Sequence, residues 1–307
     1  MRVAVTGAAG RLGSAIVAAL ADAPFTGPAG PIAWARDAFD LDAPDGIGQR
    51  IDRDKPEVVV HAAAWTDVDG CALDPELALR RNGVATGILA EATAERGVDL
   101  LVISTNEVFA GPVVTGRGHE PDDPIDPANP YARSKAEGER LATAAYDAST
   151  AAGRGHRGRL GIARTAWLFG TPGRDFPSRI LDAAERARAA GEPLRVVGDE
   201  WGTPTYTHDV ADAIVELLAD DAAAGMHHLV NGLTATRADW ARYTVARAGL
   251  DVEVENVPLD TWQRPSRPPR WGVLAATPLP SGEPMRVWPD AMADYAPRLL
   301  RAVGPRS

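Results

Sequence analysis

Cysteine is almost missing from this sequence: Cys71 is the only one in 307 residues. A disulfide within one chain needs two cysteines, and a zinc site built on thiolates needs several ligands at matched spacing. We therefore expect neither, and no grouping of acidic residues predicts another metal site. A hydrophobic core has to hold the chain together, and 45% hydrophobic with 24% charged residues is typical of a globular protein that buries one.

Long apolar runs are missing as well. No stretch reaches the roughly 18 consecutive apolar residues that a membrane-spanning helix needs. The opening MRVAVTGAAG lacks the cationic region and apolar segment of a secretory leader. The chain is therefore predicted to be cytoplasmic, with no membrane partner.

An excess of positive charge is also absent. The formal net charge is −10, and nucleic-acid backbones and anionic membranes are themselves negative, so neither is an expected partner. A nucleotide-linked small molecule remains compatible with this charge, because a few arginines gathered at one place can hold a diphosphate.

Lysine is nearly absent, with only Lys55 and Lys135 in the whole chain. Arginine supplies almost all of the positive charge, so a retained lysine can mark a position that needs an amine rather than any cation. Lys55 precedes Pro56 and reads as an ordinary exposed charge. Lys135 lies in a pattern that suggests chemistry.

The first half of the sequence alternates short apolar runs with stretches of helical spacing. Strands are predicted at residues 2–6, 31–35, 57–62, 98–104 and 159–165, and helices at 12–23, 75–95 and 131–148. Continuously apolar strands separated by helices indicate a parallel sheet covered on both faces. The predicted class is α/β, with a doubly wound parallel sheet of the Rossmann type.

The second half is less regular. Helices are predicted at residues 177–190, 210–220, 237–248 and 290–303, strands at 194–197, 227–230 and 252–257, and an ordered Pro- and Arg-rich loop at 264–284. We predict an NAD(P)-binding domain over residues 1–168, to which about 200–232 return, and a smaller substrate-binding domain over 169–307. The smaller part is expected to pack as a cap over the carboxyl edge of the sheet.

Gly7, Gly10 and Gly13 form GxxGxxG directly after the first predicted strand and at the start of the first predicted helix. Glycines there permit a tight turn, a close approach of the backbone to a pyrophosphate, and a helix close to its strand. The helix N-terminus then presents free N–H groups to the phosphates. This position predicts a dinucleotide site.

The remaining cofactor contacts are predicted at the ends of the next strands. Arg36 favours the 2′-phosphate of NADP(H), whereas Asp37 directly after it leaves NAD(H) open. Asp42 is expected to reach the adenine, and Ala62, Ala63 and Ala64 leave room for a cofactor across the sheet. The full predicted set is Gly7, Gly10, Arg11, Leu12, Gly13, Arg36, Leu41, Asp42, Ala62, Ala63, Ala64, Thr66, Tyr131 and Lys135.

Tyr131 and Lys135 form a YxxxK pair at the start of a predicted helix. The i,i+4 spacing places both side chains on one helical face. A free phenol has a pKa near 10, and a neighbouring ammonium together with a nicotinamide cation is expected to lower it, so that Tyr131 can exchange a proton with a carbonyl oxygen. Thr105, at the end of the fourth strand, is predicted to polarise that carbonyl, with Ser104 turned into the sheet.

These motifs together resemble the dTDP-4-dehydrorhamnose reductase family of extended short-chain dehydrogenases. The matching stretches run in family order over about residues 1–275: GAAGRLG, KPEVVVHAAAWTDVDGCALDPELALRRN, ISTNEVFAG, NPYARSKAEGE, RTAWLFG, GTPTYTHDVADAI, MHHLVNG and SRPPRWGVL. The resemblance implies reduction of the 4-keto group of a dTDP-4-keto-6-deoxyhexose by NAD(P)H, and some members bind magnesium. It assigns catalysis to Thr105, Tyr131 and Lys135, and places Trp167 beside the sugar.

One stretch departs from the family. Where members usually read STDYVF, this chain has Asn106 and Glu107 in place of the acid and the aromatic residue. Both are predicted to contact substrate, so a different keto sugar is a reasonable hypothesis. For the diphosphate the sequence offers Arg264 and Arg267, with Arg270 nearby, since guanidinium forks suit phosphate oxygens.

Two other functions share these motifs. A sugar-nucleotide epimerase or dehydratase with tightly held NAD would use the same fold and the same YxxxK pair, and Glu107 sits where a dehydratase would need a carboxylate. A non-catalytic NAD(P)-binding regulatory subunit is the second alternative, although Thr105, Tyr131 and Lys135 are all present. A homodimer stays open, because short-chain dehydrogenases often pair through helices.

Overall fold

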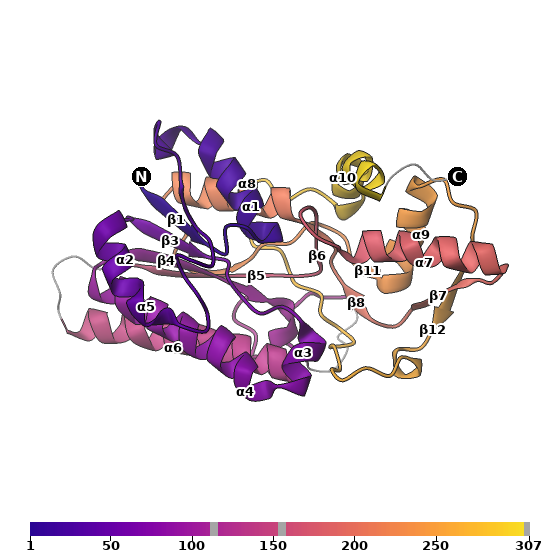
Figure 1. Ribbon diagram of the computed structural model, residues 1–307, viewed down its shortest axis with the longest axis horizontal. Helices are drawn as coiled ribbons and strands as arrows, with labels where there is room; N and C mark the ends of the chain where they lie inside the picture. The colour runs from indigo at the N-terminus through magenta and orange to yellow at the C-terminus, as the bar shows by residue number, and fades with distance from the viewer. Residues whose placement is uncertain (111–115, 153–157, 304–307) are drawn as a thin grey trace.

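A six-stranded parallel sheet forms the centre of the structure, a computed structural model that describes residues 1–110, 116–152 and 158–303 (Figure 1). The strand order is β10-β5-β4-β3-β1-β2. These strands are β1 (Val3–Thr6), β2 (Ile32–Trp34), β3 (Val58–His61), β4 (Asp99–Thr105), β5 (Leu160–Thr165) and β10 (Gly225–His228). The order steps outward from β1 in both directions, which confirms the predicted doubly wound sheet.

Helices cover both faces of this sheet (Figure 1). On one face lie α1 (Arg11–Asp22) and α8 (Thr207–Ala219), and on the other α2 (Ile47–Asp54), α5 (Ala85–Glu95) and α6 (Pro130–Ala151). Val58 and Val60 pack into the core under α1 and α8, whereas Val59 packs into the core under the other three helices. Alternate side chains of a strand point to opposite faces, which is why a strand buried on both sides is apolar throughout.

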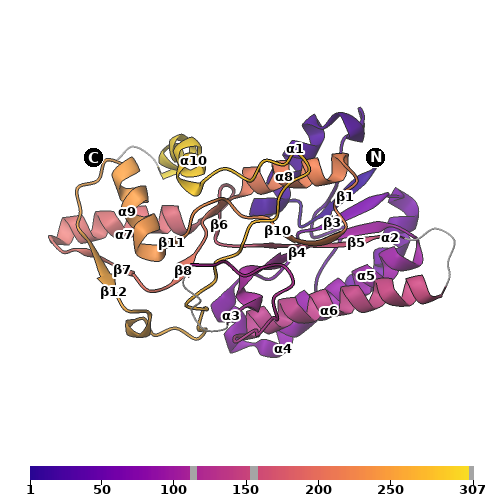
Figure 2. The same cartoon turned by 180° about the vertical axis from the view of Figure 1, so that it is seen from behind.

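A smaller lobe lies beyond the carboxyl ends of the strands (Figures 1 and 2). Its helices are α7 (Phe176–Ala190), α9 (Arg237–Arg247) and α10 (Trp288–Val303), and its short strands are β6 (Leu168–Phe169), β7 (Leu194–Val197), β8 (Trp201–Gly202), β9 (Thr205–Tyr206), β11 (Ala235–Thr236) and β12 (Val254–Val257). Phe169, Tyr206, Trp240 and Tyr295 give it an aromatic core of its own. Between β9 and the lobe's later elements, the chain returns to the main sheet through α8 and β10.

Several predicted elements differ from the structure in their ends or continuity. The helix predicted at 75–95 is interrupted: α4 (Pro75–Ala78) and α5 flank a π-helical segment, η3 (Leu79–Val84). The strand predicted at 227–230 is two residues earlier, as β10, because its pairing with β5 begins at Gly225.

Two helices were not predicted, α2 and α3 (Val68–Leu73). Only Ile47 and Ile51 of α2 are buried, so its apolar face is too narrow for the sequence pattern to reveal. The loop predicted at 264–284 contains no helix and no strand beyond isolated bridges at Trp271 and Leu274. None of the helices in the described ranges is long and apolar enough to cross a membrane.

Candidate active site

The turn between β1 and α1 depends on glycine at two positions. A Cβ on Gly13 would lie 2.1 Å from the carbonyl oxygen of Gly7, and a Cβ on Gly7 would lie 2.8 Å from the backbone of Ala63. Gly7 also has φ +63°, a conformation that favours glycine. The turn, helix α1 and the end of β3 can therefore approach one another only with these residues, and Gly10 begins α1 as its N-cap.

A cleft of about 370 Å³ starts at this turn and runs along the carboxyl ends of the sheet strands. Most of the predicted site residues line it together: Gly10, Arg11, Leu12, Gly13, Ala62, Ala64, Thr66, Thr105, Asn106, Glu107, Tyr131, Lys135 and Trp167. Gly7 and Ala63 lie behind the cleft wall, in contact with each other. Arg36, Leu41, Asp42, Arg264 and Arg267 are not among the lining residues.

Helix α6 carries the predicted proton donor and amine. Its N-cap, Asn129, accepts a hydrogen bond from the Ala132 N–H at 2.8 Å, and Pro130 occupies the first turn. Such caps fix where a helix begins, and hence which residues face the sheet. Tyr131 and Lys135 face β4 and are 9% and 3% exposed. The Lys135 Nζ donates to the Ile103 carbonyl at 2.8 Å, and burial lowers its pKa to about 8.

The Tyr131 phenol lies in a buried part of the cleft. Burial raises the pKa of its phenol well above the ordinary value, the charge of Glu107 raises it further, and a hydrogen bond with Thr105 opposes both. The predicted lowering of this pKa requires a nicotinamide cation beside the phenol as well as the Lys135 ammonium, and it stays a prediction; in this structure that ammonium donates to the Ile103 carbonyl. Tyr131 carries its proton at neutral pH, which is the form that can donate to a carbonyl oxygen.

The two hydroxyls at the end of β4 have different surroundings. Ser104 donates to Glu139 of α6, a carboxylate that forms an ion pair with Arg164 at 2.7 Å and is almost fully buried. The Thr105 hydroxyl accepts the N–H of Glu107 at 3.2 Å and caps a short 3-10 turn, η4 (Asn106–Val108). Of the two hydroxyls, Thr105 is the one that hydrogen-bonds with the Tyr131 side chain.

The two residues that depart from the family pattern have distinct contacts. Asn106 is buried, and its amide donates to the Gly272 carbonyl at 3.0 Å, which ties β4 to the loop over 264–284. Glu107 accepts a hydrogen bond from the Asn129 amide at 2.7 Å. Burial raises the pKa of Glu107, the nearby Glu200 carboxylate also raises it, and the Asn129 hydrogen bond opposes them. The ionised form of Glu107 is therefore destabilised in this cleft.

Arg237 is a cleft residue that the sequence analysis missed. Its guanidinium lies 3.6 Å from the centroid of the Trp167 ring and pairs with Glu200 at 2.9 Å. Trp167 has φ +42°, and a Cβ on Gly202 would lie 2.4 Å from its indole, so the ring is held in one place. The capping box of Thr236 predicts only that a helix begins here. The packing of α9 in the smaller lobe brings Arg237 to the cleft, and the local sequence does not reveal this packing.

Arg11 joins the glycine turn to the smaller lobe. Its guanidinium donates to the carbonyl oxygens of Gly170 at 2.9 Å and Arg174 at 2.8 Å. These two acceptors belong to the segment between β6 and α7. The start of α1, where a cofactor's phosphates would lie, is therefore held directly against the second lobe.

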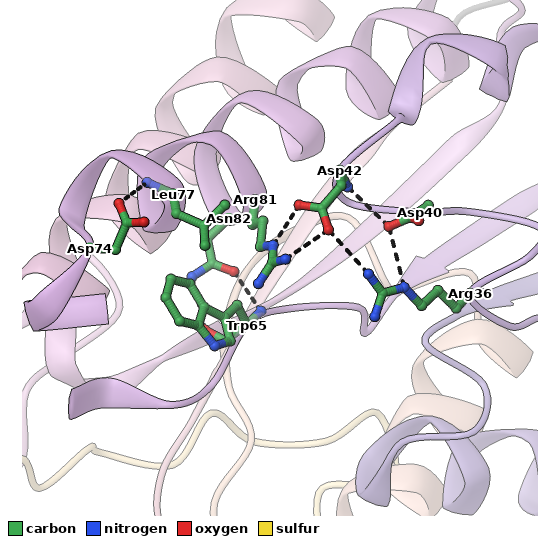
Figure 3. Close-up of polar contacts among 8 residues, drawn as sticks. All are labelled: Arg36, Asp40, Asp42, Trp65, Asp74, Leu77, Arg81 and Asn82. Atoms are coloured by element: carbon green, nitrogen blue, oxygen red, sulfur yellow. Dashed lines mark hydrogen bonds and ion pairs between the residues drawn. The ribbon is translucent and has the colours of Figure 1, made fainter. Parts of the chain in front are cut away.

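The predicted adenosine end is a charged cluster beyond the cleft (Figure 3). Asp42 accepts from both Nε and Nη2 of Arg81, at 2.6 and 2.7 Å, and from Arg36 at 3.1 Å. The hydrogen bonds from Arg81 hold the pKa of Asp42 below its usual value. Arg36 also lies 3.5 Å from Asp40. Arg81, which the sequence analysis did not single out, brings a second guanidinium to the carboxylate of Asp42. Its Cζ also lies 5.2 Å from the centroid of the Trp65 ring.

These elements together make a site for a dinucleotide and a carbonyl substrate. Gly10 and Gly13 of the glycine turn line the same cleft as Thr105, Tyr131 and Lys135. The residues present fit NAD(P), because the closeness of Gly7 and Gly13 to neighbouring backbone makes the narrow turn that a pyrophosphate requires. Within the described ranges, no group of three or more His, Cys, Asp or Glu side chains is placed to hold a metal ion.

Comparison with known proteins gives one consistent result. The RmlD substrate binding domain family matches residues 1–300. The chain is 33% identical to a dTDP-4-dehydrorhamnose reductase of Streptomyces griseus, over 98% of this chain and 94% of that protein. It is also 33% identical to a dTDP-4-keto-6-deoxy-D-glucose reductase of Streptomyces niveus, over 96% of each.

Solved structures agree. A crystal structure of a dTDP-4-dehydrorhamnose reductase from Clostridium acetobutylicum superposes with a TM-score of 0.84 and 27% identity. The alignment covers 97% of this chain and 99% of the other.

Proposed function

This chain belongs to the RmlD substrate binding domain family, and from that premise we propose that Thr105, Tyr131 and Lys135 catalyse the reduction, by NAD(P)H, of the 4-keto group of a dTDP-4-keto-6-deoxyhexose. The protein is an NAD(P)-dependent oxidoreductase of the extended short-chain dehydrogenase type that acts on a nucleotide-linked keto sugar in deoxysugar biosynthesis. The observation that supports the catalytic assignment is that Thr105, Tyr131 and Lys135 line one cleft together with the glycine turn. We propose residues 1–168, with about 200–232, as the cofactor-binding part.

The protein's groups divide the chemistry among them. When bound, NAD(P)H supplies the hydride that adds to the carbonyl carbon. Tyr131 gives its phenolic proton to the carbonyl oxygen, so that the keto group becomes a hydroxyl and Tyr131 is left as phenolate. Thr105 donates a hydrogen bond to the same oxygen and stabilises the charge that builds on it. Lys135 lies on the same face of α6 and donates to the Ile103 carbonyl, so its positive charge stabilises the phenolate through space, without a direct hydrogen bond, until solvent returns a proton.

NADP(H) is the proposed cofactor, ahead of NAD(H). The support comes from Arg36, whose side chain is 76% exposed and follows β2, where a 2′-phosphate would lie, and from Arg81 close by. Asp42 works against this preference, because its carboxylate already engages both guanidiniums. A 2′-phosphate has to compete with Asp42 for them.

The sugar end of the cleft is the part in which this chain differs from its family. Glu107 lies beside Tyr131, and Trp167 and Arg237 line the same cleft. We propose that Asn106, Glu107 and Trp167 surround the sugar, and that Arg264 and Arg267 serve the diphosphate. A carboxyl group at residue 107 can bind a sugar hydroxyl that an aromatic ring would leave unpaired.

The test is oxidation of NADPH and of NADH with freshly generated dTDP-4-keto-6-deoxyglucose, with and without a 3,5-epimerase. We expect turnover, faster with NADPH, and dependence on the epimerase identifies the sugar series. Protein that binds NADPH yet oxidises neither cofactor with either sugar would overturn this substrate. Protein that retains NAD⁺ through purification and consumes the sugar without added cofactor would instead support an epimerase or dehydratase.

A further inference from the structure

Arg11 contacts the smaller lobe from the place where a cofactor's phosphates would lie. It is the first residue of α1, directly after Gly10, and it lines the catalytic cleft. Its Nε donates to the Gly170 carbonyl and its Nη2 donates to the Arg174 carbonyl. The start of α1 therefore faces the segment between β6 and α7 (Figures 1 and 2).

The positive charge of Arg11 is not neutralised by a carboxylate. Within residues 1–110, 116–152 and 158–303, its guanidinium forms no ion pair, and its third nitrogen, Nη1, makes no hydrogen bond. The other arginine of the cleft, Arg237, pairs with Glu200. A guanidinium that donates only to neutral carbonyl oxygens keeps its attraction for an anion. Its five N–H donors also allow it to bind a phosphate oxygen without releasing the two carbonyls.

The segment that Arg11 contacts is joined closely to the start of α7. The Gly170 N–H donates to the Asp175 carboxylate at 3.0 Å, and this carboxylate also accepts the Ser178 N–H at 3.0 Å as the N-cap of α7. The Ser178 hydroxyl in turn accepts the Asp175 N–H at 3.0 Å, which completes a capping box. Reciprocal caps of this kind fix how the chain enters a helix. A displacement of Gly170 is therefore passed on to α7.

Two cleft residues are attached to the same segment. Trp167 is separated from Gly170 only by the two residues of β6. Phe176, the first residue of α7, has its ring centroid 5.3 Å from the Arg237 Cζ, and the same guanidinium covers the Trp167 ring. The place in which Arg11 holds Gly170 therefore contributes to the positions of Trp167 and Arg237, and so to the shape of the cleft around a substrate.

We propose that Arg11 is a positioning residue that makes substrate binding depend on the cofactor. Its guanidinium binds a phosphate oxygen of the dinucleotide while it donates to Gly170 and Arg174, and this charge-assisted bond orders the arginine that holds the segment. The bound cofactor thereby fixes Trp167 and Arg237. The inference rests on the proposed function, because it takes NAD(P) and a nucleotide-linked keto sugar as the two ligands. By linkage, the sugar raises the affinity for the cofactor by the same factor.

The experiment measures amide hydrogen exchange by mass spectrometry in the native protein and in Arg11→Gln. Each is compared with and without saturating NAD(P)⁺, whichever of the two oxidised cofactors binds more tightly. In the native protein the cofactor is expected to slow exchange at the turn between β1 and α1, and to slow it by about fivefold or more over residues 168–180. In Arg11→Gln the slowing at the turn should remain, and the slowing over residues 168–180 should be lost.

Two further variants sharpen the comparison. Arg11→Lys keeps the positive charge without the fork of a guanidinium, so it is expected to regain cofactor affinity but not the slowing over residues 168–180. Arg2→Gln is the matched control and should behave as the native protein. Arg2 also donates to two carbonyl oxygens, those of Asp54 and Lys55, but it lies at the opposite end of β1.

Calorimetry gives a second measurement of the same coupling. An oxidised cofactor cannot reduce dTDP-4-keto-6-deoxyglucose, so binding of this sugar can be measured with NAD(P)⁺ present. The cofactor is expected to tighten sugar binding by about fivefold or more in the native protein and in Arg2→Gln, and by about twofold at most in Arg11→Gln.

The outcomes separate this inference from the proposed function. Equal slowing over residues 168–180 in the native protein and Arg11→Gln, no slowing there in the native protein with cofactor bound, or equal tightening of sugar binding in both overturns the inference, even if the reductase activity stands. Slowing that depends on Arg11, in a protein that reduces no dTDP-linked keto sugar, supports the link between cofactor and smaller lobe and overturns the proposed reaction. A native protein that binds neither NADP⁺ nor NAD⁺ overturns both.

Discussion

Arg237 covers the ring of Trp167 at 3.6 Å while its guanidinium pairs with Glu200. The pair is shielded from water: the side chains of Arg237 and Glu200 are 23% and 7% exposed. The stack and the ion pair together fix the part of the cleft wall that Trp167 and Arg237 form. Arg237 thus has two roles to test, one in stability and one in the shape of the substrate site.

Replacing Arg237 by methionine is expected to lower the free energy of unfolding by about 3 kcal/mol, because the buried carboxylate of Glu200 loses its partner. Urea denaturation checks this value. The double variant Arg237→Met with Glu200→Gln should cost less than the sum of the two single changes, since no charge is then left unpaired. Additive costs would show that the two side chains do not interact.

Tyr131→Phe is expected to lower kcat by about 10²–10⁴-fold, because the proton donor is removed and the ring remains. NADPH affinity should be unchanged. Tyr146→Phe is the matched control, since Tyr146 is a buried tyrosine on the same helix whose hydroxyl donates to the Val98 carbonyl, at 2.6 Å. Turnover by Tyr131→Phe at the rate of this control would remove Tyr131 from the mechanism.

The buried amine of Lys135 gives a stability prediction with a definite sign. Its pKa is about 8 in the folded protein, against an ordinary value of 10.5. Between these two pH values the unfolded chain binds more protons than the folded one, so stability contributed by this group rises with pH across that window. Compared with Lys135→Met, the native protein should become relatively more stable from pH 8 toward pH 10. A constant difference between the two would show that Lys135 titrates normally.

Cofactor preference is expected to respond to Arg36 and Asp42 in opposite directions. Arg36→Ala should weaken NADPH binding more than NADH binding, and Asp42→Asn should strengthen NADPH binding about three- to tenfold by releasing Arg36 and Arg81. Dissociation constants for both cofactors check this. Arg53→Ala is the control, because it removes an exposed arginine whose partner among the described residues is Asp54. Equal changes for NADPH and NADH would leave no basis for the preference.

Local sequence patterns predicted those parts of the site that lie within one strand–turn–helix unit. Gly7, Gly10 and Gly13 fall within seven residues, and Tyr131 and Lys135 within one helical turn, so their spacing alone places them together. Thr105 follows from the end of its strand by the same reasoning. The sheet strands were predictable because both of their faces are buried.

Contacts between distant segments were not predictable in this way. Arg81 reaches Asp42 across 39 residues, and Arg237 meets Trp167 only because α9 packs against the smaller lobe's core. The surroundings of the Tyr131 phenol depend on distant segments in the same way. The sequence shows that Lys135 is a neighbour, but burial and the approach of Glu107 depend on how α6 and η4 fold together.

The contact of Arg11 with the second lobe is made entirely to main-chain oxygens, those of Gly170 and Arg174. The acceptors are main-chain atoms, but Gly170 has φ +138°, and a Cβ there would lie 2.4 Å from the Thr207 hydroxyl oxygen, so this attachment needs glycine at residue 170. Side chains elsewhere in the smaller lobe can change without removing either hydrogen bond. Relatives with a different second lobe should keep the joint as long as residue 11 remains arginine, residue 170 remains glycine and the segment keeps its length.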